Sequence, residues 1–205
     1  MPTYSLKAII SPEIVSFLNR NDQRIVIVKK NEKSKTNVAW VTFKPFQVNN
    51  VTWNTEYGIY ASNVQIQNGA TIDASSYSEA SVKNMYPFQN GVFDSPISDS
   101  ELKDNEYAIH NKSDEYEYLT FGLAQDVTAN GTNYEGNPIN AESVLYNQTV
   151  SFIPNEKICV FIESSFNDGT IITHIRSNVL NLDFTDDANV TIKYDKSIGG
   201  FVKQN

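Results

Sequence analysis

The chain of 205 residues has one cysteine, two histidines and no apolar run near the roughly 20 residues that a membrane-spanning helix needs. Because Cys159 is alone, a disulfide within the chain is excluded, and its place in the apolar run 158–162 predicts a buried thiol. The N-terminus shows no basic segment followed by an apolar core. We therefore expect no secretory signal, and a protein that is cytoplasmic or released by a non-standard route.

The sequence also lacks the motifs of the common enzyme classes. It contains no nucleophile elbow, no phosphate-binding glycine loop, no dinucleotide fingerprint and no zinc-protease motif. The only imidazole bases are His110 and His174, and neither has a nucleophile or acid partner that the sequence can assign. We therefore predict no catalytic residue and no metal or other cofactor.

Charge is distributed unevenly along the chain. Residues 1–45 carry eight Lys/Arg and three acids, a net +5, whereas residues 46–205 carry eight bases and 21 acids, a net −13, which gives −8 in all. This balance is too acidic for a general nucleic-acid binder. The basic stretch 29–35 is expected to be a solvated hairpin loop, and the alternative is a contact surface for the acidic remainder of a second copy, forming a homo-oligomer.

The composition favours β-structure. Tyr, Phe, Val, Ile and Thr are abundant, and about ten segments show strand patterns separated by turn residues. Only residues 12–19 carry a helical pattern, which begins at Ser11-Pro12. These signals predict one all-β domain over residues 1–205, an antiparallel two-sheet β-sandwich with one short N-terminal helix, and a closed β-barrel as the runner-up.

Two hairpins and one long loop can be placed by matching apolar faces. A three-residue loop around Asn68-Gly69 would pair Ile66 with Ala70, with Gly69 in the left-handed conformation. A two-residue primed turn at Asp168-Gly169 would pair Phe166 with Ile171. The stretch 126–140, rich in turn residues, is predicted to be a long exposed loop.

Acidic residues leave two weaker possibilities open. Calcium could be held by oxygen ligands around Gly131, although the pattern does not match a twelve-residue calcium loop; the residues concerned are Asp126, Asn130, Asn133 and Glu135, with a second group at Asp183, Asp186 and Asp187. Paired carboxylates within the acidic segment 94–117 could serve a glycosidase-type enzyme.

Aromatic residues supply the remaining functional signal. Two tryptophans, two tyrosines and two phenylalanines lie between residues 40 and 60. Trp40, in mid-strand, is expected in the core, whereas Trp53 and Tyr57 flank a turn, so one of them is expected to stay exposed. An exposed ring beside polar groups is typical of a sugar site. The predicted ligand-binding residues are therefore Trp53, Asn54, Glu56 and Tyr57.

The sequence thus favours a non-enzymatic binding protein, lectin-like or toxin-like, that recognises a glycan or a cell surface through loops of a β-sandwich. The first alternative is a self-assembling structural or inclusion protein, for which the charge asymmetry is the motive. The second alternative is the glycosidase-type enzyme.

Overall fold

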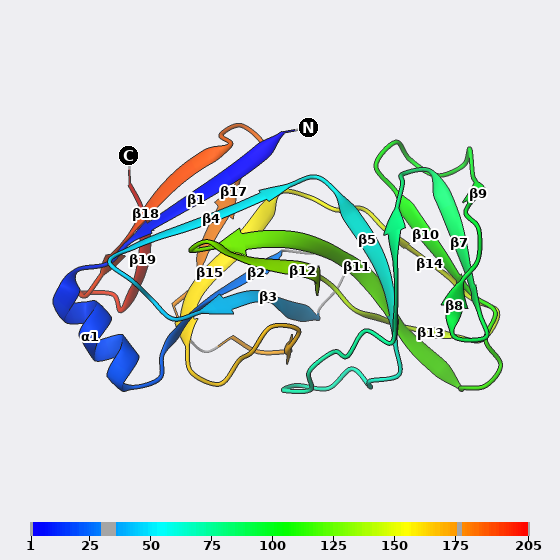
Figure 1. The fold of residues 1–205 in the computed structure, drawn as a ribbon, viewed down its shortest axis with the longest axis horizontal. Coiled ribbons are helices and arrows are strands. Elements are labelled where there is room, and N and C mark those ends of the chain that lie inside the picture. Colours follow the sequence, from blue (N-terminus) through cyan, green and yellow to red (C-terminus); the bar gives the residue numbers. More distant parts are fainter. Residues whose placement is uncertain (1, 30–35, 176–177, 205) are drawn as a thin grey trace.

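The computed structural model describes residues 2–29, 36–175 and 178–204 and shows an all-β sandwich (Figure 1). One helix, α1 (Pro12–Arg20), accompanies the strands, as predicted. The strands are β1 (Thr3–Ile9), β2 (Arg24–Lys29), β3 (Asn37–Phe43), β4 (Val48–Asn54), β5 (Tyr57–Ser62), β6 (Ser76–Ala80), β7 (Asn84–Gln89), β8 (Val92–Phe93), β9 (Ile97–Ser98), β10 (Tyr107–Asn111), β11 (Tyr118–Ala129), β12 (Thr132–Pro138), β13 (Glu142–Leu145), β14 (Thr149–Phe152), β15 (Lys157–Glu163), β16 (Ile171–Ile172), β17 (Leu180–Asp183), β18 (Asn189–Asp195) and β19 (Gly200–Lys203).

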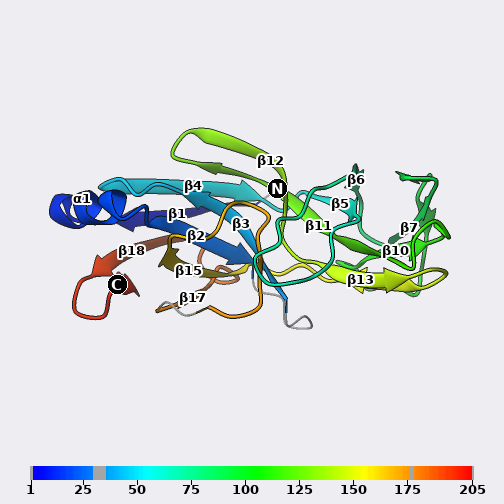
Figure 2. The ribbon, with the colours of Figure 1, turned by 90° about the horizontal axis from the view of Figure 1, so that it is seen from below.

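Three sheets build the molecule. The largest has the order β19-β18-β1-β4-β11-β5-β6, with β12 and β13 added along β11. The second sheet, β16-β3-β2-β15-β17, lies under its β1–β4 half, so that the two form the layers seen edge-on in Figure 2. A third, smaller sheet, β14-β10-β7-β8 with β9, stands at the far end of the molecule. The largest sheet ends at β19 and β6 instead of closing on itself, which excludes the closed barrel.

The pairing is mostly, but not wholly, antiparallel. Strand β1 runs parallel to β18, and β7 runs parallel to β10. Each parallel pair joins segments distant in sequence, because a short hairpin can connect only antiparallel strands. A single core cluster draws buried side chains from all three sheets, including Leu6, Ile27 and Ile109.

Several local predictions can be checked against the strands. Strand β2 is buried on both faces. Cys159 is buried on β15, as predicted, 7% exposed, with its Sγ 3.2 Å from Asn181 Oδ1. The long exposed loop over 126–140 is wrong. Asn130 and Gly131 both have positive φ, 51° and 81°, and form a two-residue turn that continues β11 into β12.

Both predicted hairpins are wrong. Ile171 pairs with Val38 of β3, not with Phe166, and of the two central turn residues only Gly169 has a positive φ, so the turn is not a primed one. Gly69 does take the left-handed conformation, but its segment docks onto the 169–171 segment: Gly69 N donates to Ile171 O at 2.8 Å. Matching apolar residues across each predicted hairpin gave the wrong pairs because each segment pairs with a segment distant in the sequence.

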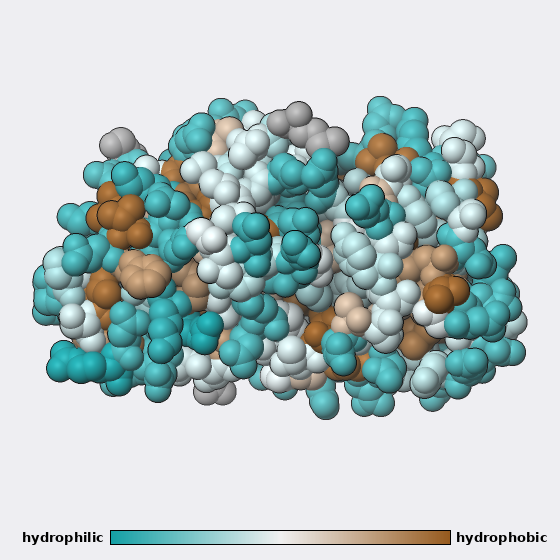
Figure 3. Space-filling model, in the orientation of Figure 1, coloured by the Kyte–Doolittle hydropathy of each residue, from teal (hydrophilic) through white to brown (hydrophobic). Residues whose placement is uncertain are grey.

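Within the described residues, no helix has the length and apolar character needed to cross a membrane. On the face drawn in Figure 3, hydrophobic residues form separate small patches among polar ones. Residues 30–35, most of the basic stretch expected to be a solvated loop or, as the alternative, a contact surface for an acidic partner, lie outside the described residues. Lys29, which begins that stretch, is 4% exposed, so the expectation of a solvated loop is wrong at this residue.

Candidate functional site

A bulge in β11 lies beside a group of polar side chains. The register between β11 and β12 shifts between Gln125 and Val127, which places Asp126 at the irregularity. Its Oδ1 accepts a hydrogen bond of 2.7 Å from Gly136 N on β12. Such bulges redirect side chains and are common near functional sites. Here Asp126 is shared by two adjoining pockets.

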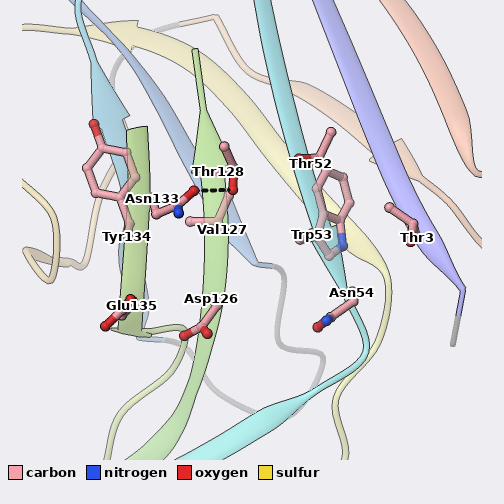
Figure 4. A pocket seen from close by; sticks show the side chains of 10 residues that line it. All are labelled: Thr3, Thr52, Trp53, Asn54, Asp126, Val127, Thr128, Asn133, Tyr134 and Glu135. Atoms are coloured by element: carbon pink, nitrogen blue, oxygen red, sulfur yellow. Dashed lines mark hydrogen bonds between the residues drawn. The ribbon is translucent and has the colours of Figure 1, made fainter. Parts of the chain in front are cut away.

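The smaller pocket, which we call the bulge pocket, lies between β4, β11 and β12 (Figure 4). It has a volume of about 320 Å³, and both polar and apolar side chains line it. Figure 4 shows Asp126 between Glu135 and Asn54 at one end, with Thr128 donating to Asn133 Oδ1 at 2.8 Å. Carboxylate, amide and hydroxyl groups thus converge on a shallow open surface.

The larger pocket, the tyrosine pocket, has a volume of about 710 Å³. Four tyrosines line it, together with carboxylates and an amide; they are Tyr57, Tyr77, Tyr86 and Tyr107, with Glu56, Glu79, Asp126 and Gln125. The β4–β5 turn runs along both pockets, since Trp53 and Asn54 line the first and residues 55–58 line the second. We call the two together the Asp126 groove.

Tyr77 is the exposed ring of this groove. The side chain is 48% exposed, whereas Tyr57 and Tyr86 are buried. Two glycines make room for it: a Cβ added at Gly58 would lie 2.4 Å from the Tyr77 ring, and one added at Gly136 would lie 3.3 Å from it. The ring is therefore held against the sheet over two side-chain-free positions, as aromatic residues often are beside strand glycines.

The pKa of the Tyr77 hydroxyl is raised, first by partial burial and then by the negative charges of Asp126 and Glu79. In the part of the chain that the structure describes, none of the residues that line either pocket is Lys, Arg or His. The groove is thus a region of negative potential with an aromatic ring in it.

The predicted residues Trp53 and Tyr57 face inward. They are 4% and 8% exposed, so the expectation that one of them stays exposed is wrong. Their polar atoms are satisfied in the interior by Glu156: Trp53 Nε1 donates to Oε2 at 2.7 Å, and Tyr57 OH donates to Oε1 at 2.5 Å. A largely buried carboxylate, 11% exposed, therefore holds both side chains away from solvent.

Lys29 completes this buried group, which we call the Glu156 cluster. Its Nζ lies 2.7 Å from Glu156 Oε2 and 4.8 and 5.0 Å from the ring centres of Trp40 and Trp53. Burial lowers the pKa of Lys29 from 10.5 to about 8, although the negative charge of Glu156 opposes the shift. Burial, and then Glu156, raise the pKa of Tyr57.

Sequence reasoning missed this cluster, although a signal for it was present. Side chains alternate along a strand, so Lys29 falls on the same face of β2 as Ile25 and Ile27, which point into the main core. Glu156 has the same parity as Ile158 and Val160 of β15. Two charges of opposite sign on the core-facing positions of neighbouring strands predict a buried ion pair.

The other predicted site residues lie at the groove. Asn54 Nδ2 donates to Glu56 Oε2 at 2.6 Å, and Glu56 N donates to Asn54 Oδ1 at 3.0 Å, so the two form a closed turn between the pockets. Trp40 is fully buried, as predicted. All four predicted residues therefore line the groove, but Tyr77, its exposed ring, was not among them.

The structure separates the residues proposed as calcium ligands around Gly131. Asp126, Asn133 and Glu135 line the bulge pocket, whereas Asn130 turns away and hydrogen-bonds the backbone of Asn50 through Oδ1 at 2.9 Å. Among the residues that the structure describes, no three His, Cys, Asp or Glu side chains are grouped closely enough to hold a metal ion. Calcium binding stays an untested alternative.

Comparison of the chain with protein-family models, with curated proteins and with solved structures found no match. The function of the protein is therefore inferred from the geometry of the groove.

Proposed function

We propose that the protein binds carbohydrate, without hydrolysing it, in the Asp126 groove. The observation that carries the proposal is the half-exposed ring of Tyr77, held against Gly58 and Gly136 beside convergent carboxylates and amides. A sugar offers an apolar face of C–H groups to such a ring, and its hydroxyls donate to carboxylate and amide oxygens.

Several features make the groove suited to this role. The Tyr77 ring rests on sheet backbone at two glycines, which limits the conformational entropy it loses on binding. Tyr57, in the wall of the pocket, is fixed from behind by Glu156. Residues from β4, β5, β6, β11 and β12 contribute, so strands position much of the groove, and the β4–β5 turn adds the rest of its edge.

Binding fits these carboxylates better than hydrolysis does. A glycosidase needs one carboxyl group whose pKa is raised by a water-poor setting, so that it can donate a proton at neutral pH. Asp126, Glu135, Glu56 and Glu79 are all exposed. Exposed carboxylates are suited to accept hydrogen bonds from hydroxyl groups.

A glycan array screened with the native protein and with Tyr77→Ala tests the proposal. Tyr116→Ala is the matched control, because Tyr116 is also 48% exposed but lines neither pocket. We expect glycans bound by the native protein and by the control, and a loss of roughly 5- to 150-fold in affinity for Tyr77→Ala, the range of a stacking contact worth about 1–3 kcal/mol.

The measured affinities would then come from calorimetric titration of the array hits. Glycan binding that Tyr77→Ala leaves unchanged would place the site elsewhere and overturn the proposal. An array without any bound glycan would overturn it as well. Near-UV circular dichroism of both variants shows that each is folded.

A further inference from the structure

The charges around the tyrosine pocket carry information about its ligand. Glu56, Glu79 and Asp126 line the pocket, and Glu135 lies in the adjoining bulge pocket. Among the described residues, no cationic side chain lines either pocket to offset them. An anionic sugar would meet like charges here, and a cationic group would be attracted.

Tyr77 adds to the same preference. The face of an aromatic ring carries negative electrostatic potential, so an ammonium group placed over it is attracted in addition to any stacking of the sugar ring. The exposed ring lies among the carboxylates, as the effect of Asp126 and Glu79 on its pKa indicates. A ligand with both an apolar face and a positive charge would use both properties.

A separate observation comes from Gln125, which lines the tyrosine pocket and is 1% exposed. Its Nε2 donates to Asn54 O at 2.5 Å, which fixes the orientation of the amide. Its Oε1 has no hydrogen-bond partner among the described residues. An unsatisfied buried acceptor costs about 1–3 kcal/mol, so a donor brought to this wall of the pocket would relieve a standing penalty.

We propose that the tyrosine pocket is selective for a sugar that carries a free, protonated amino group, a deacetylated hexosamine. This inference rests on the proposed function and narrows it to one substrate class. The ammonium group lies among Glu56, Glu79 and Asp126 at the Tyr77 ring, and an N–H of the ligand serves the Gln125 acceptor. Acetylation of the amine removes the charge and with it the selectivity.

Three trisaccharides with the same β-1,4-linked backbone isolate the charge. They differ at carbon 2 only, which carries a free amine in the glucosamine trimer, an acetamide in the N-acetylglucosamine trimer and a hydroxyl in the glucose trimer. Calorimetric titration below the pKa of the ligand amine should give at least tenfold tighter binding of the glucosamine trimer. That advantage should shrink as salt rises and as pH passes the pKa of the amine.

Variants locate the effect within the pocket. Glu79→Gln should weaken binding of the glucosamine trimer at least threefold more than it weakens binding of the neutral trimers, because only the amine loses an ionic partner. Glu115→Gln is the control, because Glu115 is an exposed acid that lines neither pocket and changes the net charge equally. Gln125→Met, checked for folding by its urea melt, should weaken the glucosamine trimer as well.

The outcomes separate this inference from the proposal beneath it. Equal affinity for the three trimers, or tighter binding of a neutral one, would overturn the amino-sugar selectivity while carbohydrate binding stands. An equal loss of affinity for the glucosamine trimer in Glu79→Gln and Glu115→Gln would mean that the preference comes from the net charge of the protein. That result would overturn the assignment of the site to the tyrosine pocket. If none of the trimers binds, the inference fails, and the glycan array decides separately on carbohydrate binding.

Discussion

The Glu156 cluster and the Asp126 groove are two groups of polar side chains that share Trp53 and Tyr57 but differ in their relation to water. In the cluster, one carboxylate receives Lys29, Trp53 and Tyr57, and the charges are enclosed. In the groove, four carboxylates face solvent, and within the described ranges no cation lines the pockets with them. An enclosed group of paired charges affects the free energy of unfolding, whereas exposed polar side chains are available to bind a ligand.

The first prediction concerns the loss of the ion pair in the Glu156 cluster. Glu156→Gln keeps the acceptor oxygen but leaves the buried ammonium of Lys29 without a counter-charge, and we expect a loss of about 3–5 kcal/mol in the free energy of unfolding. Adding Lys29→Met should restore much of it, because no buried charge then remains. Urea denaturation of the two single variants and the double variant measures the coupling. Strictly additive losses would contradict an energetic ion pair.

The second prediction concerns pH. The folded protein releases the Lys29 proton near pH 8, whereas the unfolded chain keeps it until about 10.5. Between these values the unfolded state binds more protons, so the free energy of unfolding should rise with pH, by at most about 3 kcal/mol. Above pH 10 the raised pKa values of Tyr57 and Tyr60 reverse the sign, since the unfolded chain then loses protons that the folded one keeps.

Urea midpoints measured from pH 7 to pH 11 test this profile, with a maximum expected near pH 10. Lys29→Met should lack the rise between pH 8 and pH 10 and keep the fall above it. A native profile that is flat in this range would show that Lys29 titrates normally.

The third prediction compares the two tryptophans. Trp53→Phe removes a hydrogen bond to a charged oxygen and should cost about 2 kcal/mol of stability. Trp40→Phe removes the same part of the ring but a hydrogen bond to a neutral oxygen, from Nε1 to Gln125 O at 2.9 Å, and should cost about 1 kcal/mol less. Thermal and urea melts distinguish the two. Equal costs would mean that the charge of Glu156 does not strengthen its bond to Trp53.

The smallest effect on stability is expected at the open group. Tyr77→Ala removes a half-exposed ring and should lower the free energy of unfolding by less than about 1 kcal/mol. Its effect should appear in sugar affinity instead. A loss comparable to that of Glu156→Gln, measured in the same urea melts, would show that Tyr77 is a structural residue and would end the contrast between the two groups.

The Asn-Gly dipeptides show how far local sequence determines the fold. At 90–91 and at 130–131 both residues have positive φ and each turn joins neighbouring antiparallel strands, which is the hairpin that this dipeptide favours. At 68–69 only the glycine has positive φ, and Asn68 Oδ1 accepts from Thr173 N at 3.0 Å. The same dipeptide therefore forms a hairpin or a docked loop depending on what lies beside it.

By itself, the sequence determined the class of the fold, its one helix at Pro12–Arg20 and the burial of Trp40 and Cys159. It also pointed to the segment 53–57, whose residues line the two pockets. These follow from residue composition, side-chain alternation and helix-start signals, which act over a few residues. Which side of that segment faces water was decided by tertiary structure, because Glu156, about 100 residues away, supplies the acceptor for both Trp53 and Tyr57.

Tertiary structure also created the groove. Tyr77 becomes an exposed platform because Gly58 and Gly136, from two other strands, leave space beneath its ring, and Asp126 joins the two pockets because β11 bulges against β12. The pairing of β1 with β18 and the docking of residues 69–72 on 169–171 are likewise contacts between distant segments. Sequence patterns act between near neighbours, whereas these arrangements depend on which distant strands bury each other's surfaces.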